Sequence, residues 1–215
     1  MTASFSLTSS PAPDALLAGE MPRVTQDVTI AVGENLTRGA VVGKITVGAA
    51  SGAAAPGNTG NGTIGAVTTG ANAKPGVYKV VIVEPAANAG AFIVEDPDGN
   101  IVGRGNVAAA FTGPVNFTIA DGATDFIAGD TFDITVAAGS GQWKLSVAAA
   151  TDGSQRPLAI LVGDVDATAA TKNAAVFRTG EFNEAALNFG AGHSAATVRA
   201  ALEAAQIYLK TTLAY

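Results

Sequence analysis

The side chains that could carry out chemistry are few in this sequence and lie far apart. His193 is the only histidine and cysteine is absent, so a zinc site would need three carboxylate ligands, which is a rare combination. The Gly-x-Ser-x-Gly pattern of a nucleophile elbow does not occur, and no Ser-His-Asp arrangement is indicated. We therefore interpret His193 as a loop residue and predict no catalytic residue, metal ion or cofactor.

Two acidic stretches are the remaining candidates for chemistry. Asp96, Asp98 and Asn100 alternate like the start of a calcium loop. The downstream Glu of an EF-hand is missing, however, and Pro97 suits a tight turn. The second stretch, residues 121–133, reads DGATDFIAGDTFD. Both stretches are interpreted as turns and solvent-facing strand positions.

A carboxylate pair in the second stretch gives a hydrolase as one hypothesis. Asp125 and Asp130 could act as acid and base in glycoside hydrolysis, because their spacing in the sequence does not exclude it. A sugar-cleaving groove usually carries many aromatic side chains, whereas this chain has one Trp and three Tyr. The protein is therefore predicted not to be an enzyme.

The composition favours a β-rich fold. Hydrophobic residues make up 48% of the chain and charged residues only 14%, which argues against a disordered chain and against a coiled coil. The 26 glycines and the aromatic content of 6% indicate many turns between short strands of small and β-branched residues. We predict a mainly β protein.

The charge and hydropathy patterns exclude several classes of partner. The net charge is −6 and the basic residues are scattered singly, whereas phosphate recognition needs clustered Lys and Arg. No apolar run approaches the roughly 20 residues that a transmembrane helix needs, and the first ten residues lack the features of a signal peptide. We expect a soluble protein made in the cytoplasm, with neither nucleic acid nor membrane as partner.

Residues 1–24 are predicted to form a flexible N-terminal arm. Ser, Thr, Pro and Ala dominate this segment, and its prolines interrupt regular structure. Four large apolar residues are nonetheless present, which is more than a solvated tail requires: Phe5, Leu7, Leu16 and Leu17.

Residues 25–50 and 151–215 are predicted to form one discontinuous core. Val28, Ile30 and Val32 alternate with small or polar residues, which is typical of a half-buried strand. Further strands are expected at residues 41–47, 157–162 and 174–178.

A C-terminal helix is predicted over residues 194–210. Ser194 is a good N-cap, and apolar residues from Val198 to Leu209 recur at three- and four-residue spacing. Lys210 would then lie in the last turn, where a cation complements the helix dipole. Because so short a helix is marginal alone, we expect it to dock on the β-core.

Residues 51–150 are predicted to be an inserted β-domain with flanking linkers. The stretch 48–62, GAASGAAAPGNTGNG, is almost entirely small or polar, which is typical of a linker or long loop. Turn signals then recur about every ten residues, as expected of a small β-sandwich or barrel. Strands are expected at residues 77–83, 91–94, 115–119, 131–136 and 142–147.

Several short motifs occur in a fixed order on either side of this middle segment. They are Leu16-Leu17-Ala18-Gly19-Glu20 with Pro22-Arg23; Leu36 with Arg38-Gly39 leading into Val41 to Ile45; Leu158 to Val162 followed by Asp164-Val165-Asp166-Ala167-Thr168; and Gly180-Glu181-Phe182-Asn183. With these motifs and the helix after His193, somewhat over half of the chain resembles the lambda-type bacteriophage head decoration protein family.

The resemblance implies a small β-barrel or β-tulip-like core with one C-terminal helix, assembled as a homotrimer. It implies that the trimers bind three-fold and quasi-three-fold sites on the outer surface of an expanded tailed-phage capsid, contact the major capsid protein and stabilise the shell. It also implies a virion protein made in the host bacterial cytoplasm. The arm is then expected to bind the capsid through Phe5, Leu7, Leu16, Leu17, Met21, Pro22 and Arg23.

The resemblance implies nothing about the role of the middle segment. The alternative hypothesis is therefore a carbohydrate-binding or adhesive surface module that acts through this segment, with a host-surface glycan as partner. Trp143, Tyr78 and Phe111 are the available stacking side chains, although such residues are more typical of the core of a small sandwich.

Overall fold

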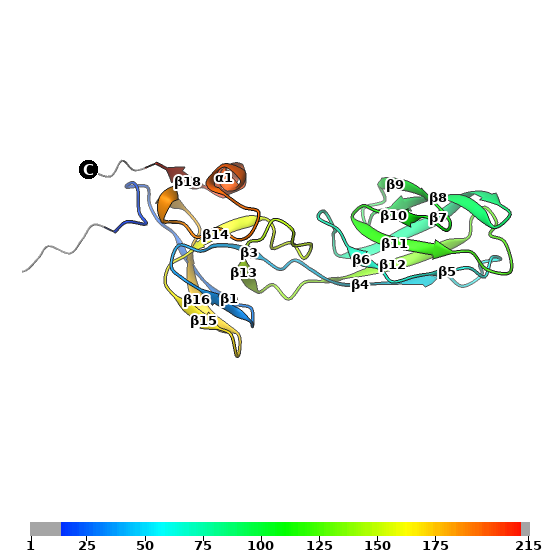
Figure 1. The fold of residues 1–215 in the computed structure, drawn as a ribbon, viewed down its shortest axis with the longest axis horizontal. Helices are drawn as coiled ribbons and strands as arrows, with labels where there is room; N and C mark the ends of the chain where they lie inside the picture. Colours follow the sequence, from blue (N-terminus) through cyan, green and yellow to red (C-terminus); the bar gives the residue numbers. More distant parts are fainter. Residues whose placement is uncertain (1–13, 212–215) are drawn as a thin grey trace, which may run out of the picture.

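Two β-rich lobes lie end to end along the long axis of the molecule, as Figure 1 shows. The structure is a computed structural model and describes residues 14–211. Within these residues one α-helix, near the C-terminal end, accompanies eighteen short strands. The predicted mainly β fold with a single C-terminal helix is thus confirmed.

The first lobe is built on a small closed barrel, which confirms the predicted barrel core. Its strands pair in the order β1-β13-β3-β14-β16. Their bounds are β1 Thr25–Ile30, β3 Val41–Lys44, β13 Trp143–Leu145, β14 Pro157–Leu161 and β16 Lys172–Phe177. The alternation in β1 has the expected effect, because Val28 and Ile30 are buried inside the barrel with Val42, Leu161 and Val176. A two-stranded sheet of β2 (Glu34–Leu36) and β15 (Val165–Ala167) extends this lobe.

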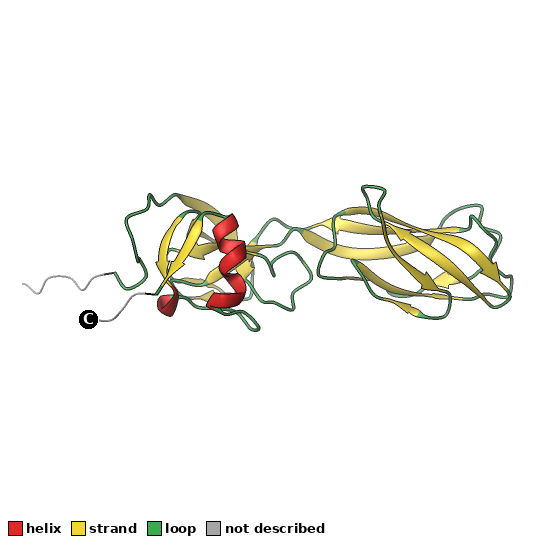
Figure 2. Ribbon diagram, turned by 90° about the horizontal axis from the view of Figure 1, so that it is seen from above, coloured by secondary structure: helices red, strands yellow, loops and turns green. Residues whose placement is uncertain are grey.

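Helix α1 (Ala195–Ala204) packs on one side of the barrel (Figure 2). Ser194 caps it, accepting a hydrogen bond from the Thr197 N–H while the Thr197 hydroxyl accepts one from the Ser194 N–H. Val198 and Leu202 of the helix are fully buried in a second cluster, so the expected docking on the β-core is confirmed. The same cluster holds apolar residues from β14 and from the parallel pair β17 (Gly180–Asn183) and β18 (Ile207–Lys210).

The predicted helix is wrong at its C-terminal end. It stops near Ala204, and the left-handed φ of +62° at Gln206 turns the chain into β18. Ile207 and Leu209 are buried whereas Tyr208 is exposed, which is the alternation of a strand. The sequence pattern predicted a longer helix because Leu209 fits both the helical spacing of apolar residues and the alternation of a strand. Lys210 is therefore not in a helical turn.

The second lobe is a β-sandwich. Its larger sheet pairs in the order β4-β12-β7-β8-β9, with β4 Val47–Ala54, β7 Gly76–Ala86, β8 Ala89–Glu95, β9 Ile101–Asn106 and β12 Thr131–Ala138. The smaller sheet consists of β5 Thr63–Ile64, β6 Thr68–Thr69, β10 Ala110–Phe111 and β11 Val115–Ala120. The two sheets enclose one core of aromatic and branched side chains, among them Tyr78, Phe92, Phe117, Phe132 and Ile134.

Two expectations about the limits of this lobe are wrong. Residues 48–54 of the stretch predicted as a linker belong to β4, which pairs with β12, whereas residues 55–62 form the loop after it. Small side chains suit this strand because Ile64 and Val67 pack where a Cβ at Gly52 would lie. The strand expected at residues 142–147 is β13, which pairs with β3 and belongs to the barrel. The sandwich thus spans residues 47–138 rather than 51–150.

The chain crosses between the lobes twice, and the two crossings pair with each other. The Gly139 N–H donates to the Thr46 carbonyl at 3.0 Å, which continues the ladder from β4 and β12 toward the barrel. A side-chain hydrogen bond also joins the two lobes, since Gln155 Nε2 of the barrel lobe donates to the Ala71 carbonyl of the sandwich at 2.6 Å. Both lobes therefore make direct polar contacts beyond their covalent connection.

Candidate functional site

Residues 14–21, the N-terminal segment, lie beside β17 and are joined to it by one isolated β-bridge and by backbone hydrogen bonds. Leu17 forms an antiparallel bridge with Phe182, and the Asn183 N–H donates to the Leu16 carbonyl at 2.9 Å. Strand β18 pairs with the other side of β17. This segment therefore belongs to the fold, which corrects the expectation of a free arm up to residue 24.

An ion pair holds the first described residue. The Arg38 guanidinium binds the Asp14 carboxylate, and this hydrogen bond lowers the pKa of Asp14 from its usual 3.8. Arg38 is itself fixed, because its Nε donates to the Val162 carbonyl at 3.1 Å and its backbone N–H donates to Asp164. The start of the segment is thus attached to two loops of the barrel lobe.

A second carboxylate holds the other end of the segment. Lys210 Nζ lies 2.6 Å from Glu181 Oε1, and this contact, with the backbone N–H groups of Met21 and Glu20, lowers the pKa of Glu181. The chain passes so close that a Cβ at Gly19 would lie 1.6 Å from Glu181 Oε2. Only glycine at position 19 permits this approach without displacing the carboxylate.

The predicted capsid-binding residues divide into three groups. Phe5 and Leu7 lie outside the described residues. Leu16 is only 2% exposed and packs in the cluster beneath α1, so it is a core residue and not a free contact, and Leu17 is half-buried against β17. Met21 is half-buried, and Pro22 and Arg23 are exposed.

Sequence reasoning missed the residues that fix this segment, namely Asp14, Arg38 and Glu181. Arg38 and Glu181 stand in two of the motifs shared with the decoration family, which was the only available signal. Asp14 binds Arg38 and Glu181 binds Lys210, and the folded barrel lobe brings together the two residues of each pair.

The described chain enters and leaves the structure at the same end of the molecule. Figure 1 shows both the start of the described chain and β18 on the barrel lobe, away from the sandwich. The tip of the sandwich lies at the opposite end of the molecule. Strand β12 runs from this tip toward the barrel, so its Thr131–Val81 pair lies farther from the barrel than its Val136–Gly76 pair. One end thus carries both chain termini and the other carries only sandwich loops.

The aromatic residues considered for sugar stacking are all buried. Tyr78 and Phe111 belong to the sandwich core, and Trp143 lies in the barrel core with the Arg178 guanidinium 5.3 Å from its ring. Each is at most 7% exposed and they belong to two separate cores, so these three residues do not form a stacking platform.

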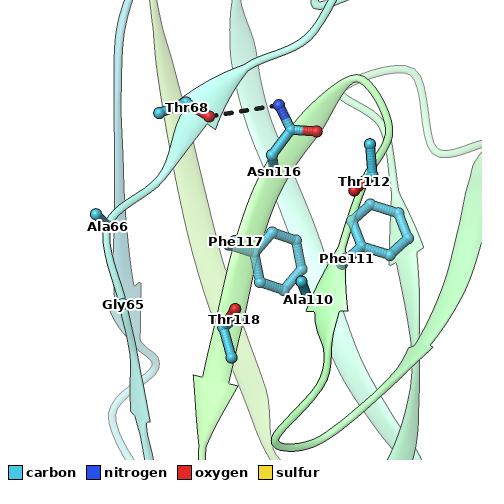
Figure 3. Close-up of a pocket in the computed structure, with 9 residues that line it drawn as sticks. All are labelled: Gly65, Ala66, Thr68, Ala110, Phe111, Thr112, Asn116, Phe117 and Thr118. Atoms are coloured by element: carbon cyan, nitrogen blue, oxygen red, sulfur yellow. Dashed lines mark hydrogen bonds between the residues drawn. The ribbon is translucent and has the colours of Figure 1, made fainter.

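A shallow depression of about 420 Å³ lies on the smaller sheet of the sandwich (Figure 3). Phe111 and Phe117 form its apolar part, and Thr68 and Asn116 contribute polar groups that bond to each other at 3.4 Å. No ionisable side chain lines it, so the depression offers no acid, base or nucleophile for catalysis.

The turn at Asp96 has the expected structural role. Asp96 is buried and accepts the backbone N–H groups of Asp98 and Asn100 at 3.0 and 2.9 Å. Lys74 Nζ lies 3.0 Å from its carboxylate and supplies the balancing positive charge. Within residues 14–211 no group of three or more His, Asp or Glu side chains is arranged to hold a metal ion.

Asp130 is buried and serves the fold of the sandwich, contrary to the expectation of a solvent-facing position. It accepts the backbone N–H groups of Thr59, Gly60 and Ile127 at 2.8 to 3.0 Å. Burial alone would raise the pKa of Asp130, but these three donors lower it below its usual value. A carboxylate held ionised by three donors is a poor proton donor. Asp125, the other residue of the hypothetical carboxylate pair, accepts a hydrogen bond from the Asn88 N–H.

His193 is a loop residue, as predicted. Its Nε2 lies 3.2 Å from both the Ser146 hydroxyl and the Gln155 carbonyl, so it joins the loop before α1 to the barrel. No helix in the described part of the chain is long and apolar enough to cross a membrane.

Comparisons with solved structures give only a weak similarity. Two crystal structures of Xanthomonas campestris FlgL, in space groups H3 and C2, align with a TM-score of 0.33 and 21% identity. The alignments cover 46% and 49% of this chain and 33% of FlgL, so the chain spans about a third of that protein. A similarity of this size does not establish a shared fold or function. A comparison with curated proteins finds no match.

The family comparison is specific and covers both lobes. A family model described as bacteriophage lambda head decoration protein D matches residues 6–207, which include the N-terminal segment, the barrel, the sandwich and α1. The motifs that carry the resemblance, from residues 16–23 to residues 180–183, all lie within this match. The chain therefore belongs to the bacteriophage lambda head decoration protein D family, whose members are structural proteins of the phage capsid rather than enzymes.

Proposed function

We propose that this protein binds the outer surface of an expanded tailed-phage capsid as a homotrimer and stabilises the shell. Its partner is the major capsid protein at three-fold and quasi-three-fold sites, and it is made in the cytoplasm of the bacterial host. Membership of the head decoration family supports the role in capsid decoration. The orientation and the means of attachment rest on the geometry of the chain.

The observation that carries the orientation is the position of the chain termini. Residues 1–13, the tail, are joined to Asp14, which lies at the end of the molecule farthest from the sandwich tip. A tail that binds the shell therefore directs the barrel lobe toward the capsid and the sandwich outward. We propose that the sandwich is an insertion into the decoration core that projects from the shell.

The distribution of charge fits this orientation. Residues 47–138 contain eight acidic and three basic residues, so the sandwich carries −5 of the net charge of −6. The barrel lobe is close to neutral and makes the proposed protein contact. Charged surfaces are unfavourable in the centre of a protein interface, which favours the barrel lobe over the sandwich as the contact surface.

The energetics of the tail favour a trimer. Ordering about ten residues costs roughly 10–20 kcal/mol, and net hydrogen bonds return about 1 kcal/mol each. Phe5 and Leu7 could add about 1.5–3 kcal/mol apiece on burial, whereas Leu16 is already used within the barrel lobe. One tail therefore binds the shell weakly. Three tails on one trimer bind more tightly, because binding of the first raises the effective concentration of the other two at the shell.

Site-specific labelling tests the orientation directly, because the chain has no cysteine. Ala87→Cys places a thiol in the exposed turn after β7, and Tyr208→Cys places one on the exposed face of β18. On decorated shells we expect a bulky maleimide to label the first as in free protein and the second far more slowly. Equal labelling of both on shells would contradict the orientation.

Two measurements test the assembly and the tail. Sedimentation equilibrium should give the mass of a trimer, and a monomer at micromolar concentration would contradict the proposed assembly. Deleting residues 1–13 should abolish co-sedimentation with expanded shells while the trimer stays folded. Normal decoration by the truncated protein would show that the tail does not attach it.

A further inference from the structure

Several kinds of contact hold the N-terminal segment. Its backbone forms one bridge and further hydrogen bonds with β17, and its Leu16 side chain enters the cluster under α1. An ion pair holds its first residue, and the Glu181 carboxylate accepts the backbone N–H groups of its last two residues. The sequence around it contains prolines at positions 11, 13 and 22, which disfavour any continuous strand or helix. Tertiary contacts therefore hold this segment in place.

We propose that residues 14–21 are an anchor that fixes where and in which direction the tail leaves the barrel, and that shell binding depends on this anchor. The inference rests on the proposed function, since it assigns a positioning role within the same attachment. Residues 1–13 make the contact with the capsid, and residues 14–21 fix the position on the barrel from which they extend.

Leu16 is the centre of the anchor. It is 2% exposed, and its Cδ1 lies close to Gly39, where a Cβ would be only 3.3 Å away. Truncating a buried leucine removes packing and leaves a cavity. Because no regular element follows until β1, this loss is expected to release the segment locally instead of unfolding the barrel.

The two charged contacts fix the ends of the segment. At the start, Asp14 is bound by Arg38, which is held by the Val162 carbonyl. At the end, the Glu181 carboxylate binds Lys210 of β18 and faces the backbone of residues 20 and 21. Both contacts are partly exposed, so each is weak alone, and the anchor depends on their combination with Leu16.

Loss of the anchor lengthens the tether on each protomer. The next fixed point is Pro22, whose carbonyl accepts the Thr179 hydroxyl at 2.9 Å, and the Val24 N–H donates to the same hydroxyl oxygen. The chain before the first fixed point would then grow from 13 to 21 residues. Effective concentration falls roughly as the −3/2 power of tether length, which is about twofold per tail and about fourfold for the two tails that bind after the first.

Shell binding by anchor variants tests the proposal. Leu16→Ala alone and with Asp14→Asn should weaken co-sedimentation with expanded shells about fourfold or more. Hydrogen exchange should rise in residues 14–21 while the Trp143 fluorescence melt changes little. Val32→Ala is the matched control, because Val32 is an exposed aliphatic residue of the barrel lobe at 59% exposure, and it should bind as wild type.

A second variant separates tether length from damage to the barrel. Inserting about eight Gly and Ser residues between Pro13 and Asp14 lengthens the tail as much as loss of the anchor would and leaves the anchor intact, so it should reproduce the weakening. Wild-type binding by this insertion or by Leu16→Ala, with loss of binding on deletion of residues 1–13, would overturn the anchor and leave the proposed function standing. Normal binding after that deletion would instead overturn the tail mechanism itself.

Discussion

The buried carboxylate of Asp130 gives a quantitative test of what holds the sandwich together. Its Oδ1 accepts the Thr59 N–H at 2.8 Å, and its Oδ2 accepts those of Gly60 and Ile127 at 2.9 and 3.0 Å. The residue thereby closes the loop between β4 and β5 onto the turn before β12. We predict that Asp130→Asn destabilises the sandwich and leaves the barrel lobe stable.

The magnitude follows from the number of donors. An Asn side chain has one acceptor oxygen, so it can retain two of the three N–H groups at most and must direct its own NH2 group at the third. A hydrogen bond to a charged group contributes about 1.5–3 kcal/mol, and an unsatisfied buried donor costs about 1–3 kcal/mol. We therefore expect a loss of about 2–4 kcal/mol, which lowers the Tm of a domain of this size by roughly 10–20 °C.

The chain offers a probe that reports on the barrel lobe alone. Trp143 is the only tryptophan and lies in the barrel core, whereas far-ultraviolet circular dichroism reports on both lobes. Asp130→Asn should shift the thermal transition seen by far-ultraviolet circular dichroism more than the one seen by Trp143 fluorescence. The matched control is Asp133→Asn in β12, three residues along the chain, which removes the same charge and should stay within about 0.5 kcal/mol. A shift for Asp130→Asn no larger than for this control would refute the structural role of the carboxylate.

Three further predictions concern the barrel lobe. Gly43→Ala should destabilise it severely in a Trp143-detected melt, because a Cβ there would lie 2.0 Å from a backbone carbonyl oxygen, whereas Gly163→Ala, with no atom within 4 Å of its Cβ, should be nearly neutral. Ser194→Ala should cost about 1 kcal/mol by removing the N-cap of α1, measured by denaturant titration, and an unchanged midpoint would contradict the cap. The pKa values of Asp14 and Glu181 are lowered in the folded protein, so their contribution is present above the usual values of 3.8 and 4.5 and is lost as the pH falls through the folded values. Limited proteolysis at residues 14–21 should therefore become faster below about pH 4 while the barrel stays folded, and a rate independent of pH would contradict the charged contacts.

Much of the architecture was predictable because it depends on local periodicity and turn chemistry. Alternating residues such as Val28 and Ile30 identify β1, and Ser194 identifies the start of α1. The recurring turn signals between short strands indicated the sandwich, although both of its expected limits were wrong. These features depend on side chains within a few residues of one another, so the linear pattern contains them.

The errors share a different physical origin. Strand β4 has no side-chain signal, because its glycines and alanines are ordered by backbone pairing with β12, more than seventy residues away. Strand β18 was mistaken for a helix because Leu209 follows Ala205 at a helical spacing of four residues and Ile207 at a strand spacing of two. Trp143 was assigned to the sandwich because sequence proximity does not reveal that its strand pairs with β3.

The N-terminal segment shows most clearly what the sequence determines and what the tertiary structure decides. The sequence by itself determined that residues 1–24 are broken by proline and contain apolar residues in excess of a solvated tail. Whether such a residue is buried in its own chain or is free for a partner depends on distant atoms. The β17 pairing and the carboxylates of Asp14 and Glu181 decide that Leu16 is internal, because only the folded barrel brings Arg38 and Lys210 to those carboxylates.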